Sequence, residues 1–198
     1  IVTLNIGGVV DVAQWRDQVD AILLAWQPGL EGGNAIADVI SGKVNPSGKL
    51  ATTFPNVYQD DITAKNFPGK EFKDRPIPGV FGQKAYEAEV VHEEGIYVGY
   101  RYYNTFNVKP AYEFGYGLSY TYFNYCNLKT SAAVMTDNLQ VSLTVTNRGS
   151  VAGKEVVQLY LSAPNRKLDK PAAELKAFAK TKLLQPGESQ EITFSLRP

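Results

Sequence analysis

Residues 139–146 alternate apolar and polar side chains without interruption (Leu-Gln-Val-Ser-Leu-Thr-Val-Thr). Because successive side chains of a strand point to opposite faces, this alternation predicts a strand with one buried face. Shorter strand-like segments, separated by turn residues at 147–149 and 185–188, follow at 155–161, 175–178, 183–184 and 192–196. Residues 116–198 are therefore predicted to form an all-β sandwich.

The first 58 residues follow a different pattern. The run Ile1–Ile6 is apolar and rich in β-branched residues, as in a buried parallel strand, and residues 20–26 form a second such run. A helix is predicted over Ala35–Ile40, with Asn34 as its N-cap. Residues 12–19, between the two apolar runs, form a short helix or a loop. After the helix, residues 45–48 form a turn and residues 49–54 an extended stretch. This order predicts part of a doubly wound α/β sheet in residues 1–58.

Residues 59–115 are predicted to be a connector, because they show weak periodicity and many prolines and glycines. Nine of the 12 tyrosines in the chain lie between Tyr97 and Tyr125. Tyrosine buries a large area and keeps a polar tip, which favours an aromatic packing belt between two domains. The alternative interpretation is a surface on which sugar rings stack.

Composition excludes several classes of function. The 20 basic and 20 acidic residues give a formal net charge of zero, which argues against nucleic-acid binding and against polybasic attachment to a membrane. No apolar run approaches the roughly 20 residues that cross a bilayer. The single cysteine, Cys126, excludes an internal disulfide and a cysteine-based zinc cluster.

Local motifs for a cofactor or a metal are weak. Gly7-Gly8 follows a predicted strand, but neither a dinucleotide fingerprint nor a P-loop accompanies it. The single histidine, His92, lies among Glu89, Glu93 and Glu94, and an exposed histidine beside acids explains this pattern better than a metal site does. The sequence therefore predicts no cofactor and no metal.

Both ends of the chain lie inside strand-like segments, Ile1–Ile6 and residues 191–196. A domain rarely starts and stops within a sheet, because unpaired strand edges are left exposed. The sequence thus predicts part of a longer polypeptide, with the β-sandwich truncated at its C-terminus. We expect residues 1–55 to pack against the sandwich, to exchange with a second copy of the chain, or to pair with a separate chain that carries the rest of the sheet.

Several stretches resemble glycoside hydrolase family 3, the β-glucosidases and β-xylosidases. AWQPGLEGGNAIADV and NPSGKL resemble the family's α/β sandwich domain. GIYVGYRYY and FGYGLSYT resemble the connector that follows it, and GKEVVQLY and LQPGE resemble its fibronectin type III-like domain. The corresponding residues are 25–39, 45–50, 95–103, 114–121, 153–160 and 184–188. The resemblance spans almost the whole chain in the family's order, and implies an α/β fragment followed by an immunoglobulin-like or fibronectin type III-like sandwich.

The resemblance also implies a function. Family members are retaining, exo-acting β-glycosidases that hydrolyse O-glycosyl bonds. Their aspartate nucleophile lies in a TIM-like barrel, and their glutamate acid/base lies before the strand with which this chain opens. Both catalytic residues are therefore expected outside this chain, and the fragment alone is expected to be an inactive scaffold. The expected partners are a β-linked oligosaccharide or glucoside, bound by the full-length enzyme, and the N-terminal barrel domain or a second copy of the chain. A periplasmic or secreted location is also implied.

Two residues of the family-like turn are candidates for binding substrate. Trp26 ends a predicted strand and Glu31 lies within the glycine-rich turn 27–33 that follows it. If this turn lies at the carboxyl edge of the α/β sheet, it faces the crevice where ligands bind. The simpler interpretation is a structural turn with Trp26 in the core. Arg101, among the tyrosines, is a candidate to stack on an aromatic ring or to pair with a carboxylate across the domain junction, although the simpler interpretation, without such a role, is favoured.

Three hypotheses remain at this point. The first is that the chain is the C-terminal scaffold of a family 3 β-glycosidase. The second is a carbohydrate-binding or interaction module that uses the tyrosine-rich surface, and the third is a purely structural accessory.

Overall fold

The computed structural model describes residues 1–135, 137–164 and 167–197. Its N-terminal part contains β1 (Val2–Leu4), a 3₁₀ turn η1 (Arg16–Gln18), β2 (Ile22–Leu24) and α1 (Gly32–Ile40). Strands β1 and β2 pair in parallel, with Val2 opposite Ile22. The two predicted strands and the α/β character of this part are confirmed, although each strand is shorter than its apolar run. No described helix has the length and apolar character needed to cross a membrane.

Helix α1 corrects one prediction. It begins at Gly32, so Asn34 lies inside the first turn and is not the N-cap; Glu31 holds that position without a side-chain cap. The glycine pair Gly32-Gly33 is already helical, because the backbone N–H of Gly32 reaches the carbonyl of Gly29 and starts the helix early. The helix ends at Ile40, with Ser41 as its C-cap, and the next residue, Gly42, has a φ of +76°.

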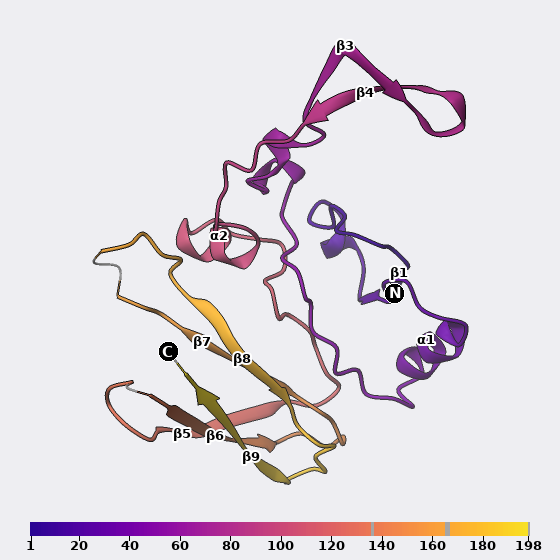
Figure 1. The fold of residues 1–198 in the computed structure, drawn as a ribbon. Helices are drawn as coiled ribbons and strands as arrows, with labels where there is room; N and C mark the ends of the chain where they lie inside the picture. Colours follow the sequence, from indigo (N-terminus) through magenta and orange to yellow (C-terminus); the bar gives the residue numbers. More distant parts are fainter. Residues whose placement is uncertain (136, 165–166, 198) are drawn as a thin grey trace.

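The connector contains more regular structure than its sequence indicates. After the 3₁₀ turns η2 (Tyr58–Asp60) and η3 (Ala64–Asn66), β3 (Lys70–Pro78) and β4 (Lys84–Glu89) form an antiparallel hairpin that includes η4 (Val80–Gly82). Helix α2 (Tyr100–Thr105) follows. The prolines and charges of β3 hide the alternation by which a strand is recognised, and Figure 1 shows the hairpin projecting from the rest of the molecule.

The extended segment 49–54 does not join the β1–β2 sheet. The backbone N–H groups of Leu50 and Phe54 donate to the carbonyls of Tyr116 and Tyr112, so the segment pairs with the end of the connector. An apolar cluster of Val12, Phe54 and Ala111 lies beneath it. The N-terminal part thus packs largely on the connector.

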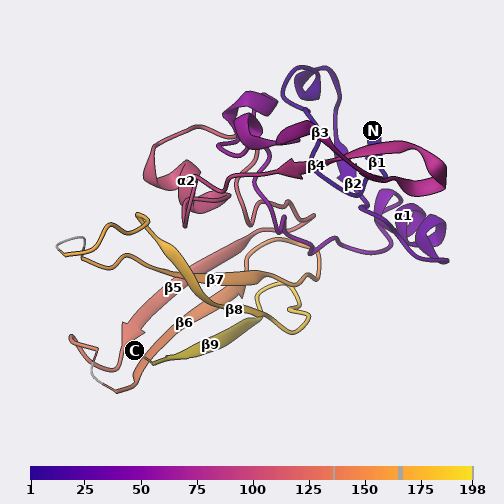
Figure 2. The same ribbon diagram turned by 45° about the horizontal axis from the view of Figure 1, so that its top comes forward.

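The C-terminal part is a sandwich of two antiparallel sheets. One sheet has the order β5-β6-β9 and the other pairs β7 with β8, as Figure 2 shows. The strands span Phe123–Thr130, Leu139–Asn147, Ser189–Leu196, Val156–Leu161 and Glu174–Lys180, in that order. The core between the sheets comprises Leu143, Val145, Val157, Leu184, Ile192 and Phe194. The predicted all-β sandwich is confirmed, and its most regular predicted strand, 139–146, is β6.

One of the strands predicted for the sandwich is not a strand in the structure. Residues 183–184 form no strand; Leu184 makes a single bridge to Gly153 and is fully buried. Its apolar character therefore reflects a loop residue that fills the core rather than a strand. Strand β5, in turn, was not singled out by the sequence, because its exposed face carries Tyr125 and Leu128 beside polar residues and breaks the alternation.

The turn before β9 makes stability depend on pH. The ammonium of Lys182 lies 2.5 Å from the Glu188 carboxylate, and this hydrogen bond, followed by one from the backbone of Gln185, lowers the pKa of Glu188 below its ordinary value of 4.5. A carboxyl with a lowered pKa stabilises the fold above its unfolded-state pKa, and this contribution is lost as pH falls through the folded-state pKa. Urea unfolding midpoints are expected to fall as pH is lowered from about 6 to about 3. The substitution Glu188→Gln should flatten part of that dependence, whereas Glu191→Gln, an exposed glutamate of β9, should leave it intact.

Candidate functional site

Trp26 lies directly after β2 and belongs to the core. Its backbone has a φ of +54°, a left-handed conformation that is unusual for a bulky residue. This conformation turns the indole toward Phe54, with ring centroids 6.3 Å apart, in the apolar cluster around Val12. The half-buried indole is therefore fully explained by packing, and its role in binding substrate stays a prediction.

Glu31 lies at the end of the same turn, as the residue before α1, and is exposed. Its carboxylate accepts a hydrogen bond from the side chain of Asn34 in the first turn of α1. Gly32 permits the turn, because a Cβ there would collide with Pro28. The structure thus does not bring Trp26 and Glu31 together, and the substrate-binding role of Glu31 is likewise a prediction.

A second turn, residues 45–48, holds three segments together. The side chain of Asn45 donates to the carbonyl of Ala152 at 3.0 Å and accepts hydrogen bonds from the Ser119 hydroxyl and the Tyr120 backbone N–H, each at 2.9 Å. Asn45 belongs to the α/β part, Ser119 and Tyr120 to the end of the connector, and Ala152 to the sandwich. We call the residues 45–49, 117–120 and 152–155 the domain junction.

Replacing Asn45 by alanine should loosen the domain junction. The substitution removes three hydrogen bonds, two of them partly buried, to the Ala152 carbonyl and the Ser119 hydroxyl, so the free energy of unfolding is expected to fall by about 2 kcal/mol. Asn34→Ala, which removes one exposed hydrogen bond, is the matched control and should change stability by less than about 0.5 kcal/mol. Equal effects of both substitutions in urea denaturation would contradict the role of Asn45.

An ion pair completes the domain junction. The Lys49 ammonium lies 3.0 Å from the Glu155 carboxylate, with only 15% and 12% of the two side chains exposed. The ammonium also donates to the carbonyl of Gly117 at 2.6 Å. Gly117 must be a glycine here, because a Cβ would run into the carbonyl oxygen of Gly48. The pair therefore ties the residue after the 45–48 turn to the residue before β7.

The inner part of the tyrosine belt packs between the two parts of the chain. The Tyr100 ring contacts Phe114 and Tyr160, with centroids 5.1 and 5.6 Å apart, and its hydroxyl accepts a hydrogen bond from the backbone of Leu175 in β8. Burial raises the pKa of Tyr160. These contacts confirm the predicted packing belt for Tyr100.

Two further tyrosines extend the packed belt toward the N-terminal part. Tyr112 packs against Phe54 and Tyr116, and the Arg16 guanidinium lies 5.3 Å from its ring centroid. Tyr103 is 4% exposed, and burial, followed by the charges of Asp61 and Asp60, raises its pKa to about 12. The outer residues Tyr120, Tyr122 and Tyr125 stay largely exposed.

Arg101 makes the contacts that the less favoured interpretation of this residue predicts, and its guanidinium lies 5.7 Å from the centroid of the Tyr100 ring. Its guanidinium lies 3.6 Å from the carboxylate of Glu174 in β8, which confirms a pairing across the junction. The nearby Lys176 and then Arg101 lower the pKa of Glu174. His92 pairs with Glu94 at 2.9 Å and lies away from the domain junction. Among the residues that the structure describes, no group of His, Cys, Asp and Glu side chains is arranged to hold a metal ion.

Sequence reasoning missed the roles of Asn45 and Lys49, because it assigned Asn45 only to a turn and Lys49 only to an extended segment. A signal was present, because Asn45 and Ser119 belong to two separate stretches that resemble the same family. Residues that lie 74 positions apart yet share a hydrogen bond can be linked only through the folded chain.

Comparison with known proteins agrees with this arrangement. A family model for the glycosyl hydrolase family 3 C-terminal domain matches residues 1–120. The chain belongs to glycosyl hydrolase family 3. A model for a fibronectin type III-like domain matches residues 155–198, so the α/β part of this family 3 chain is followed by a fibronectin type III-like sandwich.

Curated relatives and solved structures of family 3 match nearly all of the chain. β-Glucosidase A of Butyrivibrio fibrisolvens is 44% identical over 99% of this chain, which covers 24% of that protein. The structure of β-glucosidase 3B from Thermotoga neapolitana in complex with glucose is 52% identical with a TM-score of 0.88, over 99% of this chain and 25% of that one. The Bifidobacterium adolescentis family 3 β-glucosidase is 41% identical with a TM-score of 0.86, over 98% of this chain and 26% of that one. This chain therefore spans about a quarter of the length of these relatives.

Proposed function

We propose that this chain is the C-terminal part of a retaining, exo-acting β-glucosidase that hydrolyses O-glycosyl bonds. The observation that carries the proposal is the match of nearly the whole chain to β-glucosidases at 44% and 52% identity, together with the same fold. In such an enzyme one carboxylate attacks the anomeric carbon, and a carboxylic acid protonates the leaving oxygen and then activates water. Both groups are proposed to lie in polypeptide that precedes this chain, the nucleophile in a barrel domain and the acid/base in the part of the α/β sandwich before the strand with which this chain opens.

The proposed role of residues 1–198 is to complete and hold the α/β domain. Two parallel strands are too few for a stable sheet, and the apolar residues Ile1 and Leu30 are 65% and 100% exposed. We infer that preceding strands pair with the β1–β2 sheet and cover this surface. The domain junction then fixes the completed domain on the sandwich through Asn45 and the Lys49–Glu155 pair.

The packing of the tyrosine belt supports the scaffold role over a sugar-binding module. Tyr100, Tyr103 and Tyr112 present their rings to other protein groups and are not free to stack on a sugar. The candidates Trp26 and Glu31 remain proposed substrate-side residues of the complete enzyme, at the edge of the sheet that would face its cleft.

Hydrolysis of an aryl β-glucoside tests the proposal. The complete polypeptide is expected to release the aglycone and to yield the β-anomer of glucose first, because retention follows from a covalent intermediate. The chain 1–198 alone is expected to give no turnover above a buffer control. Turnover by the chain alone after removal of contaminating enzyme, or release of the α-anomer by the complete polypeptide, would overturn the proposal.

A further inference from the structure

The hairpin of β3 and β4 forms an arm that has no further strand beside it. Within the described part of the chain, β3 and β4 pair only with each other. In both Figure 1 and Figure 2 the arm extends away from the sandwich, on the side of the N-terminal segment. An isolated two-stranded hairpin is marginally stable in water, so an arm of this kind needs a surface against which to pack.

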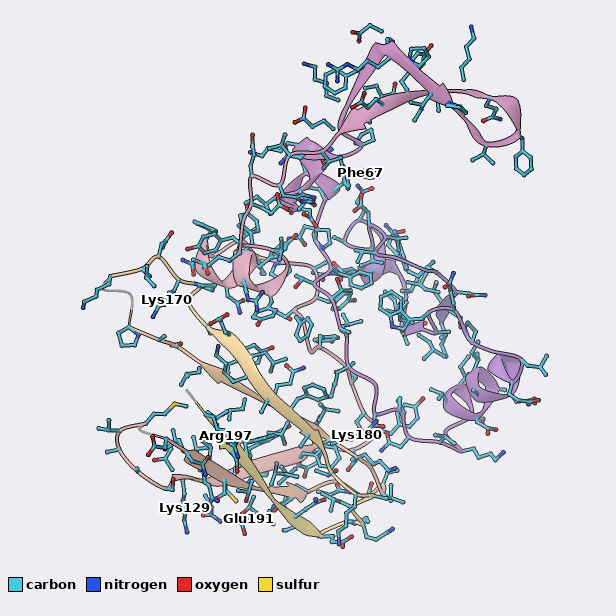
Figure 3. All side chains as sticks on the ribbon, in the orientation of Figure 1. Phe67, Lys129, Lys170, Lys180, Glu191 and Arg197 are labelled. Atoms are coloured by element: carbon cyan, nitrogen blue, oxygen red, sulfur yellow. The ribbon has the colours of Figure 1, made fainter. Side chains whose placement is uncertain are left out.

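In the middle of the arm an aromatic side chain packs against other side chains of the arm, whereas the apolar side chains at its two ends are exposed. The Phe72 ring lies beneath the Arg75 guanidinium and the Lys70 ammonium, 4.7 and 5.4 Å from its centroid, and Arg75 also lies 3.5 Å from Glu87. Phe67, at the base of the arm in Figure 3, is 68% exposed.

The tip of the arm is the most exposed apolar feature of the hairpin. Val80 is 72% and Phe81 99% exposed. Phe81 also has a φ of 54° and a ψ of 33°, a left-handed conformation that disfavours an aromatic residue. This conformation presents a whole phenyl ring to solvent without any packing in return within the described residues, which is characteristic of a docking residue.

The tip is built to dock by side chains rather than by adding a strand. Pro76 and Pro78 lie in β3 near the tip and lack backbone N–H groups. At these two positions β3 therefore cannot donate the hydrogen bonds that another strand would need, which disfavours strand addition near the tip. The arm suits an apolar pocket that receives the Val80 and Phe81 side chains.

The domain that receives the arm can be inferred from the length of polypeptide that precedes Ile1 and from the position of Ile1 in the structure. The chain spans about a quarter of its relatives, and its matching model is that of a C-terminal domain, so most of a complete family 3 polypeptide precedes Ile1. That polypeptide must leave from Ile1, beside the uncovered β1–β2 layer and on the same side as the arm. A nine-residue strand reaches roughly 30 Å, enough to extend over a neighbouring domain.

We propose that the β3–β4 arm docks its tip, Val80 and Phe81, and its base, Phe67, on the domain that precedes this chain in the complete polypeptide. The arm thereby holds that domain against the α/β part from a second side, independently of the strands that continue the β1–β2 sheet. This inference rests on the proposed function, because it requires the preceding domain.

Hydrogen exchange in the complete polypeptide tests the docking. Backbone amides of residues 70–89 are expected to be protected, and Phe81→Gly is expected to raise their exchange rates about 10-fold or more. Glycine adopts the left-handed conformation of this position without strain, and the substitution removes the side chain that is proposed to dock. The hairpin itself is therefore not weakened by this substitution, and lost protection reports lost docking. Leu128→Ser, at a residue of β5 that is 71% exposed, is the matched control and should leave the arm unchanged.

Two results would overturn the inference. One is rapid exchange throughout residues 70–89 in the unmodified complete polypeptide, or protection that Phe81→Gly leaves intact. The other is protection that appears only with rising concentration and a doubled mass, which would make a second copy the occupant. Glucosidase activity is measured on the same sample: an active enzyme with a freely exchanging arm refutes the docking alone, whereas an inactive enzyme with a protected arm refutes the proposed function alone.

Discussion

Lys49→Met is expected to lower the free energy of unfolding by about 3 kcal/mol, because it leaves the Glu155 carboxylate buried without its counter-charge. Glu155 is 12% exposed on its side chain, and its carboxylate is otherwise bonded to the backbone N–H of Val156. The loss of the hydrogen bond from Lys49 to the Gly117 carbonyl adds to the effect. Urea denaturation followed by circular dichroism measures the change.

The chain contains a matched control for this ion pair. Lys43 and Asp38 also form a contact of 2.9 Å, but 72% of the Lys43 side chain is exposed. Exposed pairs contribute little, so Lys43→Met should change stability by less than about 1 kcal/mol. The double variant Lys49→Met with Glu155→Gln should recover part of the loss, because no buried charge remains. A Lys49→Met variant as stable as Lys43→Met would refute a buried, stabilising pair.

Leu184→Ala is expected to destabilise the sandwich by about 3 kcal/mol, the range for removing a buried leucine from a core that cannot collapse around the cavity. Leu184 is fully buried and contributes to the cluster with Val145 and Phe194. Its backbone also bonds in both directions with Gly153. The bridge therefore holds the residue in place and limits relaxation around the cavity.

The adjacent residue provides the control. Leu183 precedes Leu184 in the same loop but is 49% exposed. Leu183→Ala should cost less than about 1 kcal/mol, because little apolar area is lost from the interior. Comparable losses in the two variants would show that the loop, rather than the buried side chain, determines the stability of this region.

The sandwich was the most predictable part of the chain. In β6 and β9 each buried residue is flanked by exposed or half-buried ones over most of the strand, so the burial pattern repeats the sequence pattern. This correspondence arises because one face of each strand meets the core and the other meets solvent. Leu184 shows the limit, since an apolar loop residue and a short strand look alike in sequence.

The connector was the least predictable part. Strand β3 alternates poorly and contains Pro76 and Pro78, and its pairing with β4 includes a register shift between Phe72 and Pro76. Such a hairpin is defined by its cross-strand partner rather than by a buried face. Helix α2 is also difficult to recognise from sequence, because its aromatic residues have low helix propensity. Their rings instead contact Phe106, Phe114 and Tyr160.

The candidate site residues also differ in how far the sequence predicted their surroundings. Pairing of Arg101 with a carboxylate was the less favoured interpretation of this residue, and the structure shows it with Glu174. Trp26 and Glu31 lie on one turn in sequence, yet the left-handed backbone at Trp26 sends its indole into the core while Glu31 stays at the surface. A sequence motif specifies the turn, but the side-chain directions depend on a single φ angle within it.

The sequence alone determined the division into an α/β part and a β-sandwich and the family resemblance, because hydrophobic periodicity and turn motifs are local properties of the chain. The tertiary structure alone decided that Asn45, Lys49 and Glu155 join the two parts and that the β3–β4 arm stands apart. The physical reason is separation: Lys49 and Glu155 attract each other only when folding removes both from water and places them 3.0 Å apart.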